Sequence, residues 1–590
     1  MIAPGTVLLD DNLSASRRNR LFTGPRDILV AYDAAGARAA LARLAAATEA
    51  GLWAAGYLAY ELGYLFEERL APLLPPRTAT PLLWLGLYDA PSQPDAAAID
   101  ALLGPAPGAA LDIVPELAEA AYGRAFAQVE ELIAAGDVYQ VNLTMKARFR
   151  LAGSASGLYR RLAASQKVAY GAFIHAGDHV VLSRSPELFV AAADGWLRAR
   201  PMKGTAPRGR SFVEDEAARA ALAADAKNRA ENLMIVDLLR NDLGRIAATG
   251  SVRVTDLFSV ETYPSLHTMT SGIEARQKPG IGIEALLENL FPCGSITGAP
   301  KLRAMEIIEA VEAGPRGLYT GAIGYVAPGG ESCFSVAIRT AVIDAAGRGE
   351  IGIGGGIVAD SRAAAEYREA LLKMAFLADP APPVTLIETL KWTPQTGFVL
   401  LDRHLDRLLA SARYFALRAE RPALARLLAG AAEDWHGPMR VRLTLGEAGP
   451  ELTAVPLPPN PENFRFALAG ERLDSTSIWL AHKTTNRAFY DTPRQTAQAA
   501  LGVDEVVFLN ERGEVTEGSF TNLFIERGGQ LFTPALASGL LPGTLRAELL
   551  ARDEAREAVL TLADLDAAEA IFLGNSVRGL LRAQWVRDQP

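Results

Sequence analysis

Residues 352–359 read Gly-Ile-Gly-Gly-Gly-Ile-Val-Ala, and this stretch decides between two kinds of fold. From Gly354 it fits the pattern G-x-G-x-x-A of a dinucleotide-binding turn, and a helical pattern follows at 363–377. The strand–helix–strand unit that such a turn needs does not continue, because the helix runs into the prolines of 379–384. A glycine-rich strand whose backbone amides approach a carboxylated ligand explains the run as well.

The surrounding patterns mix helices and strands without strict alternation. Apolar residues at helical spacing predict helices at 117–135 and 214–246, and β-rich runs predict strands at 339–343 and 351–358. The last 200 residues also mix both types. The expected fold class is therefore α+β.

Proline- and glycine-rich stretches indicate the domain boundaries. Prolines at 379–384 follow a helix and precede strand-like residues, and a weaker Gly/Pro/Ala stretch lies at 104–108. The expected organisation is an N-terminal part (1–110), a catalytic domain (111–378), a proline-rich linker (379–384) and a second enzyme domain (385–590).

Composition excludes several classes of protein. The 590 residues are 49% hydrophobic and 22% charged, which is a globular composition. A net charge of −9 argues against a nucleic-acid binder, although local basic pockets for an anionic metabolite remain open. Two cysteines exclude a disulfide scaffold and a four-cysteine zinc site. With no apolar stretch of about 18 residues, we expect a soluble, cytoplasmic protein without a membrane span.

Two residues in rigid segments are candidates for covalent and acid catalysis. Lys203 lies between Pro201-Met202 and Gly204, and burial would lower its pKa enough to make it a nucleophile or a base. Glu187 follows a proline and precedes apolar residues, where a glutamate keeps its proton and acts as a general acid. The plainer alternatives are a surface lysine in a turn and an exposed loop glutamate.

Three carboxylates are candidate Mg²⁺ ligands. Glu366, Glu369 and Lys373 share one face of a helix at i, i+3 and i+7. With Glu231 from the other long helix they could supply oxygen ligands for Mg²⁺. The alternative is a solvated helix face with an ordinary Glu–Lys pair.

Residues 115–377 resemble the chorismate-utilising enzymes throughout. Gly56–Glu61 is also similar to the aminodeoxychorismate synthase component I branch of that family. The motifs that carry the resemblance are Gly136–Asn142, Ser183–Phe189, Pro201–Thr205, Glu231–Leu238, Tyr263–His267, Phe291–Lys301, Tyr319–Gly321, Ala337–Thr340 and the helix of Glu366, Glu369 and Lys373.

The resemblance implies two facing sheets with outer helices that hold chorismate and Mg²⁺ between them. It implies Glu187 as the general acid and His267 and Thr297 as neighbours of the substrate ring. The implied metal ligands are Glu231 and Glu369, with Glu366 close by; the implied carboxylate-binding positions are Tyr319, Arg339, Lys373 and the backbone of Gly354, Gly355 and Gly356.

Lys203 indicates the branch of this family, because anthranilate synthases usually carry alanine there and the aminodeoxychorismate branch carries lysine. The implied reaction begins when the amine of Lys203 attacks C2 of chorismate while Glu187 protonates the departing C4 hydroxyl. Ammonia then enters at C4 and expels the lysine. Gln140 stands where isochorismate- and salicylate-forming relatives have a lysine base, which argues against those reactions.

The ammonia requires a source. A glutaminase needs a nucleophilic cysteine with a histidine, and Cys293 and Cys333 both lie in segments already assigned. We therefore expect a separate glutamine amidotransferase subunit or the use of free ammonia.

A second constellation lies near the end of the chain. Lys483 follows a strand-like run, Ser477–Ala481, and Glu517 comes later. A turn at Leu541–Arg546 then feeds a helix, whose N-terminal amides form an anion site. A lysine, a carboxylate for a pyridinium nitrogen and a phosphate site are the parts of a pyridoxal phosphate site.

Residues 384–590 resemble the class IV pyridoxal-phosphate enzymes, which comprise aminotransferases and aminodeoxychorismate lyase. These folds have two α/β subdomains and are commonly dimers, so a homodimer through this domain is expected. The implied site consists of Lys483 as the Schiff-base lysine, Glu517 as the pyridine partner, Arg407 and the amides of Thr544 and Leu545 at the phosphate, and Asn575 and Ser576 in a late loop.

The fusion favours one combined activity, the conversion of chorismate and ammonia to 4-aminobenzoate and pyruvate for folate biosynthesis. An anthranilate synthase fused to a branched-chain or D-amino-acid aminotransferase is the alternative, and Lys203 counts against it. A docking module with an idle cofactor site is a third reading, which the presence of Lys483, Arg407 and Glu517 disfavours.

Overall fold

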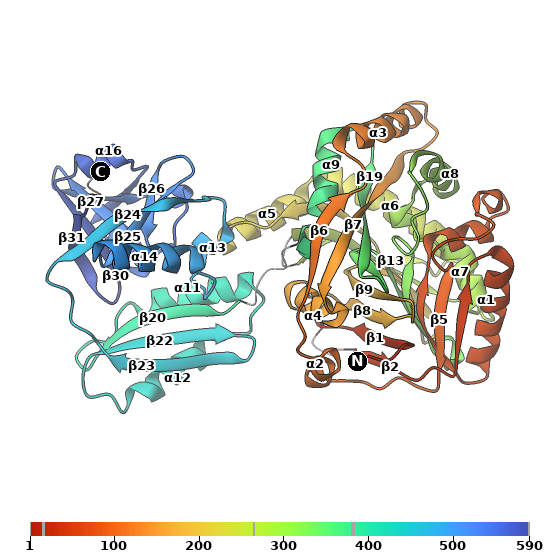
Figure 1. Cartoon of the computed structure of the whole chain (residues 1–590), viewed down its shortest axis with the longest axis horizontal. Helices are drawn as coiled ribbons and strands as arrows, with labels where there is room; N and C mark the ends of the chain where they lie inside the picture. The colour runs from red at the N-terminus through yellow and green to blue at the C-terminus, as the bar shows by residue number, and fades with distance from the viewer. Residues whose placement is uncertain (1, 15–17, 264–265, 379–383, 588–590) are drawn as a thin grey trace. The chain divides into compact units, whose positions relative to one another are not determined.

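The chain divides into two compact units in the computed structural model (Figure 1). The first contains residues 1–207 and 219–381, and the second contains residues 208–218 and 382–590. Helices and strands are mixed throughout, so the predicted α+β class is confirmed. The structure describes residues 2–14, 18–263, 266–378 and 384–587; residues 379–383 of the predicted linker, 264–265 of the Tyr263–His267 motif and 588–590 of the last predicted domain lie outside this part.

The first unit contains a nine-stranded and a ten-stranded sheet, and all strand pairs described in both are antiparallel. In the first sheet the order is β15 (Gly298–Ala299), β7 (Gln140–Gly153), β19 (Arg348–Ile357), β18 (Thr340–Asp344), β9 (His179–Ser185), β8 (Tyr170–His175), β1 (Thr6–Asp10) and β2 (Arg20–Phe22), with β6 (Gly108–Pro115) beside β7. In the second it is β12 (Met202–Pro207), β14 (Leu266–Arg276), β11 (Trp196–Arg200), β10 (Leu188–Ala193), β17 (Ser332–Val336), β16 (Ala322–Val326), β4 (Trp53–Leu58), β5 (Leu83–Tyr88) and β3 (Asp27–Ala31), with β13 (Arg253–Thr262) beside β14.

The two sheets face one another across a shared apolar layer. Val7 and Ile174 from the nine-stranded sheet belong to the same buried cluster as Tyr57 and Ile323 from the ten-stranded sheet. Because β1 pairs with β8, and β4 pairs with β16, residues from the first 110 positions complete both sheets. The N-terminal part and the residues after it therefore form one core.

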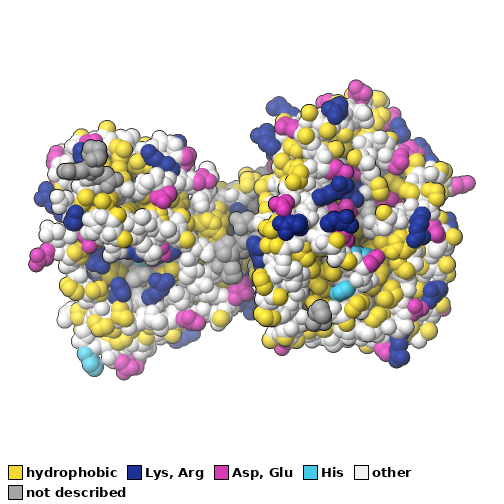
Figure 2. All heavy atoms as spheres, in the orientation of Figure 1, with side chains coloured by type: hydrophobic (Ala, Val, Ile, Leu, Met, Phe, Trp, Pro, Cys, Tyr) yellow, Lys and Arg dark blue, Asp and Glu magenta, His cyan; other side chains and the backbone are white. Residues whose placement is uncertain are grey.

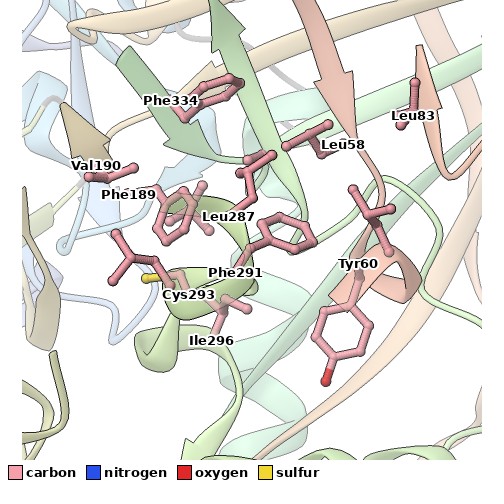
Figure 3. Packing of buried hydrophobic residues seen from close by; sticks show 14 of the residues in the cluster. Leu58, Tyr60, Leu83, Phe189, Val190, Leu287, Phe291, Cys293, Ile296 and Phe334 are labelled. Atoms are coloured by element: carbon pink, nitrogen blue, oxygen red, sulfur yellow. The ribbon is translucent and has the colours of Figure 1, made fainter. Parts of the chain in front are cut away.

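Helices carry the rest of the first core, and the predicted helices are present. The segment predicted at 214–246 is two helices, because the Asp225 side chain accepts from the Asn228 amide and begins a new one. Phe189, Phe291 and Cys293 pack in the large cluster (Figure 3). The helices of this unit are α1 (Ala34–Glu49), α2 (Ala96–Leu103), α3 (Glu119–Ala134), α4 (Ala155–Ser165), α6 (Ala226–Ile246), α7 (Ile283–Leu290), α8 (Lys301–Val311), α9 (Ala363–Leu372) and α10 (Ala375–Ala378), while the residues of α5 (Phe212–Ala224) are divided between the two units.

The second unit has a small sheet in which successive side chains point to opposite faces. Along β22, Val441, Leu443 and Leu445 are buried against helices, whereas Arg440 and Arg442 point to the other face. The strand order is β21 (Gly397–Phe398), β20 (Leu386–Thr393), β22 (Met439–Gly446) and β23 (Gly449–Pro456), and the helices are α11 (Leu401–Tyr414) and α12 (Arg421–Ala432).

An eight-stranded sheet forms the rest of this unit. Phe466, Val507 and Leu523 lie in its main core cluster. The order is β26 (Val515–Gly518), β25 (Glu505–Asn510), β24 (Phe464–Leu473), β31 (Gly579–Trp585), β30 (Ala570–Asn575), β27 (Asn522–Arg527), β28 (Gln530–Pro534) and β29 (Ala555–Ala558), with helices α13 (Ile478–Ala481), α14 (Ala488–Leu501), α15 (Thr544–Ala551) and α16 (Leu562–Asp566).

The strand-like reading of Ser477–Ala481 is wrong. Residues 478–481 form the short helix α13. A five-residue apolar run does not distinguish a strand from a helical turn by its periodicity. Here packing decides, because Leu480 is buried and Trp479 stacks on Phe415 at 5.9 Å.

The surface carries no extended field of one charge on the face drawn in Figure 2. Among the described side chains there, acidic and basic groups are interspersed with apolar ones. Over the described parts of the chain, no helix is both long enough and apolar enough to cross a membrane.

Gly352→Ala should destabilise the first unit. A Cβ at Gly352 would lie 2.0 Å from Cγ of Tyr319, and overpacking of this kind costs about 1–3 kcal/mol. Gly123→Ala is the matched control, because Gly123 lies inside α3 with nothing within 4 Å of the added Cβ. There the helix should gain about 0.5–1 kcal/mol. Thermal denaturation followed by circular dichroism tests both, and an unchanged midpoint for Gly352→Ala would contradict the packing described.

Candidate active sites

Strand β19 brings side chains from several elements to one place in the first unit. A Cβ at Gly356 would lie 2.9 Å from Nε2 of Gln140 on β7. At Gly355 it would lie 3.3 Å from Oε2 of Glu366 and 3.4 Å from Nζ of Lys373 on or next to α9. The glycine-rich run therefore acts as the predicted strand and admits polar side chains close to its backbone.

Lys203 lies at this place on β12 and is half-buried. Its Nζ donates to Oδ1 of Asn142 over 3.4 Å, and Gln140 donates to the same oxygen over 3.3 Å. Burial lowers the pKa of Lys203, while the charge of Glu187 opposes this change. A larger share of its amines is therefore neutral than for a lysine in water.

Glu187 is buried, with 3% of its surface exposed, and it accepts a 2.6 Å hydrogen bond from Oγ of Ser295. Burial raises the pKa of Glu187 to about 7, although Ser295 and Lys203 both favour the charged form. Ser295 in turn is next to Asn142, which donates to its carbonyl oxygen over 3.2 Å. This carboxyl therefore holds or releases a proton close to neutral pH.

The three predicted metal ligands lie on two helices, Glu231 on α6 and Glu366 and Glu369 on α9. Burial raises the pKa of Glu231, and the charges of Glu366 and Glu369 act in the same direction. Lys373 bonds Oε1 of Glu369 at 2.8 Å and also donates to the carbonyl of Gly354 over 2.8 Å. Across the described residues, no three acidic, cysteine or histidine side chains are gathered closely enough to hold a metal.

The other predicted substrate contacts lie around the ends of strands. Tyr319 and Arg339 flank the β16–β17 hairpin, and the amide of Thr320 donates to the carbonyl of Ala337 over 2.9 Å. Burial lowers the pKa of Arg339, whose guanidinium donates to Gln166 over 3.2 Å.

His267 and Thr297 are both fully buried. Nδ1 of His267 lies 3.0 Å from Oγ1 of Thr262. The carbonyl of Thr297 accepts a hydrogen bond from the backbone amide of Asn142 over 2.8 Å. Thr297 therefore adjoins the Lys203 site through Asn142, whereas His267 is held by the β13–β14 pair.

The second unit encloses a cavity of about 960 Å³ that gathers the predicted cofactor residues. Lys483, Arg407 and Glu517 all line it. Burial, aided by Arg407 and Arg487, lowers the pKa of Lys483 to about 8. A neutral amine is therefore accessible there, as a Schiff base requires.

Glu517 is held by three donors. Tyr490 donates to it over 2.6 Å, the Leu541 amide over 2.8 Å and Asn522 over 3.1 Å. Burial nevertheless raises the pKa of Glu517 to about 7. A fixed carboxyl that shares a proton near neutral pH suits a partner of a ring nitrogen.

An ion pair with the buried Glu388 holds Arg407 in place. Nη2 of Arg407 lies 2.7 Å from Oε2 of Glu388, which also lies 2.6 Å from Nδ1 of His404. Arg407 and His404 together hold the pKa of Glu388 down to about 2 against its burial. This carboxylate thus stays charged and orients both side chains.

Two of the remaining predicted cofactor positions, Ser576 and Thr544, contact His404 of α11. Oγ of Ser576 lies 2.9 Å and Oγ1 of Thr544 lies 3.3 Å from Nε2 of His404. Asn575 donates to the carbonyl of Phe520 over 3.1 Å. Leu545 lies in the first turn of α15, where its amide belongs to the free N-terminal amides of the helix.

Five residues in these sites were not predicted. Ser295 and Asn142 lie inside quoted motifs, but nothing in the sequence pairs them with Glu187 and Lys203. Tyr490, Asn522 and Glu388 reach their partners only through the fold. A polar residue at a buried strand position is the one available signal for Glu388 and Asn522, and Tyr490 on α14 has none.

Comparison with known protein families matches two different families to two parts of the chain. The profile of the chorismate binding enzyme family matches residues 11–379. The profile of class IV amino-transferases matches residues 385–585.

Individual relatives match the first unit. Aminodeoxychorismate synthase component 1 of Salmonella typhimurium is 43% identical over 259 residues, which are 44% of this chain and 57% of the relative. Anthranilate synthase component 1 of Streptomyces coelicolor is 42% identical over 258 residues, 44% of this chain and 50% of the relative. The crystal structure of anthranilate synthase component I from Streptococcus pneumoniae covers 64% of this chain and 93% of its own, at 26% identity and a TM-score of 0.52. The matched part spans about half the length of the relatives found by sequence.

Ser295→Ala should raise the pKa of Glu187 further. The lost hydrogen bond to a charged group is worth about 1.5–3 kcal/mol, which corresponds to a rise of roughly one to two pKa units. Infrared difference spectroscopy follows the protonated carboxyl band, which Glu187→Gln identifies by removing it. Ser332→Ala is the control, because its buried hydroxyl has no hydrogen-bond partner among the described residues. An unchanged titration in Ser295→Ala would contradict the assignment.

The raised pKa of Glu187 also predicts how stability depends on pH. At Glu187 the folded chain binds more protons than the unfolded chain between about pH 4.3, the ordinary glutamate pKa, and pH 7. The contribution of Glu187 to the free energy of unfolding should therefore fall as pH rises through this range. The free energy of unfolding, measured against pH, should have a more negative slope in the unaltered protein than in Glu187→Gln, and equal slopes would refute the expectation.

Proposed function

The chain belongs to the chorismate-binding enzyme family, and from that premise we propose that it converts chorismate and ammonia to 4-aminobenzoate and pyruvate in two steps. The first unit aminates chorismate to 4-amino-4-deoxychorismate. The second unit, which carries the class IV amino-transferase match, removes pyruvate from that product.

One observation carries the first step: a lysine with a lowered pKa and a glutamic acid with a raised pKa share one site. The neutral amine of Lys203 attacks C2 of chorismate, the ring double bond shifts, and the C4 hydroxyl leaves as water with the proton of Glu187. Ammonia then bonds to C4 while the C2–nitrogen bond to Lys203 breaks, and the proton that ammonia loses returns to Glu187. Asn142 orients the amine for the attack.

The α6 and α9 carboxylates fit a magnesium ion. Mg²⁺ takes one or two carboxylates and keeps several waters, so a cluster of three acidic side chains is not needed. Glu366 and Glu369 lie together beside Gly355, and burial raises the pKa of Glu231, so that a bound cation would favour its charged form. When bound, the ion supplies positive charge that offsets the carboxylates of chorismate.

The two cysteines support a separate source of ammonia. Burial raises the pKa of Cys293 to about 12 and that of Cys333 to about 11. A glutaminase nucleophile requires the opposite shift, towards the thiolate. Ammonia would therefore come from a separate glutamine amidotransferase subunit or from solution.

The second cavity fits pyridoxal phosphate, which when bound supplies an electron sink. Lys483 would carry the cofactor, and once free its neutral amine would take the C4 proton of the substrate. Glu517 would hold a proton at the pyridine nitrogen, kept in place by Tyr490 and Asn522. Arg407 and the amides at the start of α15 would bind the phosphate. Loss of the C4 proton aromatises the ring as pyruvate leaves.

The combination of units favours the lyase reaction over transamination, because the product of the first step is the substrate of the second. Anthranilate synthase relatives match the first unit almost as well, so an anthranilate-forming enzyme fused to an aminotransferase is the competing function. Lys203 separates the two, since the anthranilate branch usually carries alanine at that position.

The two lysines should divide the reaction. Lys203→Ala should lower the rate of amination by more than about 1,000-fold, since the loss of a covalent nucleophile has an effect of that order. It should leave the release of pyruvate from supplied aminodeoxychorismate unchanged. Lys483→Ala should make and accumulate aminodeoxychorismate. Chromatography of the products tests both variants. If either substitution stopped both half-reactions in a folded protein, the assignment of one step to each unit would fail.

Glutamine should not replace ammonium for the purified chain. Both thiols are held in the protonated form by burial, so no nucleophile for glutamine is available. The rate of amination is measured with ammonium and with glutamine, and then with glutamine plus an added amidotransferase subunit. Glutamine-dependent turnover by the chain alone would contradict the prediction.

A further inference from the structure

The small sheet of the second unit presents two arginines to the cofactor cavity. Arg440 and Arg442 alternate with the buried residues of β22, so both lie on the face away from the core. Both side chains are exposed and both line the cavity of about 960 Å³ that holds Lys483. Thr389 and Thr453, the register neighbours of Arg442 on β20 and β23, line it too, as does Val455, the β23 neighbour of Arg440.

Neither arginine is neutralised by the protein. Arg407 and Arg487 in the same cavity are paired with Glu388 and Asp491. Among the residues that the structure describes, Arg440 and Arg442 form no ion pair and donate no side-chain hydrogen bond. Their positive charges therefore face the cavity without an acceptor.

Other donors in the cavity also lack partners. Nε of Arg494 and Nδ2 of Asn486 are buried atoms without a hydrogen-bond partner in the described structure, and both residues line the cavity. The carboxylates that line the cavity already accept hydrogen bonds from other groups. Glu517 accepts from three donors, and Asp504 accepts from the Arg465 amide over 2.9 Å. The cavity therefore has hydrogen-bond donors without acceptors, and an anionic ligand would supply the acceptors.

The spacing of the two arginines fits a ligand with two carboxylates. Residues i and i+2 of a strand are about 7 Å apart along it and point to the same side. Each guanidinium binds one carboxylate through two parallel hydrogen bonds. An apolar side chain in this place would leave both guanidiniums dehydrated and unpaired, which selects against it.

We propose that Arg440 and Arg442 determine the specificity of the second unit by binding the two carboxylates of a dianionic amine substrate. This inference rests on the proposed function, in which 4-amino-4-deoxychorismate carries one carboxylate on its ring and one on its enolpyruvyl group. It also excludes a branched-chain amino acid, which has one carboxylate and an apolar side chain, as the preferred substrate.

The test uses the full chain loaded with pyridoxal phosphate and two probes that lack an amine, isophthalate with two carboxylates and benzoate with one. Binding is followed through the visible absorbance of the cofactor, which reports only on the second unit. Arg440→Gln and Arg442→Gln should each weaken isophthalate at least about tenfold, as for the loss of one charge-assisted pair. Benzoate should weaken less in at least one variant. Arg426→Gln, on the exposed side of α12, is the matched control.

Turnover separates a role in binding from a role in folding. With supplied aminodeoxychorismate, the double variant should raise KM at least tenfold while cofactor absorbance and the melting temperature stay unchanged. Unchanged isophthalate affinity and KM in the double variant would overturn the inference, and the proposed function would stand if pyruvate were still released. Arginine-dependent isophthalate binding without any release of pyruvate would instead refute the proposed function and leave a dianion site.

Discussion

Close approach to the backbone of β19 is the constraint on which the first site depends. Three elements reach this strand: the segment of Tyr319, the β7 residues Gln140 and Asn142, and α9 with its carboxylates and Lys373. A side chain at Gly352 or Gly356 would overlap the ring or the amide that lies there. The missing Cβ atoms thus allow a lysine, an amide and carboxylates to lie close together beside this backbone, where partial burial strengthens the interactions between their charges.

Both units use the same electrostatic arrangement for different chemistry. Each buries a lysine, which lowers its pKa, near a glutamate whose pKa rises to about 7. Burial disfavours the charged form of each group, and nearby opposite charges only partly compensate. Such groups destabilise a fold, so their occurrence as a lysine and a glutamate in each unit indicates function more than stability.

The sequence was sufficient for the fold class and the helices with strong periodicity, whereas the roles of the predicted site residues stay predictions. The segment at 117–135 is predicted by its apolar spacing alone, and β19 is predicted because prolines exclude the competing fold. The strand predicted at Ser477–Ala481 was wrong. This run is too short to show a hydrophobic period, and the packing of Leu480 and Trp479 determines its helical conformation. Partners such as Ser295 for Glu187 and Tyr490 for Glu517 could not be predicted, because the chain brings them together only through tertiary pairing.

A product analysis of the full chain tests the central claim most directly. The protein is supplied with chorismate, ammonium, Mg²⁺ and pyridoxal phosphate, and the products are separated and quantified over time. Equal amounts of 4-aminobenzoate and pyruvate, with aminodeoxychorismate only transient, are expected if Lys203 and Lys483 act in sequence. Anthranilate as the product would contradict the role given to Lys203, and with it the reading of the first unit.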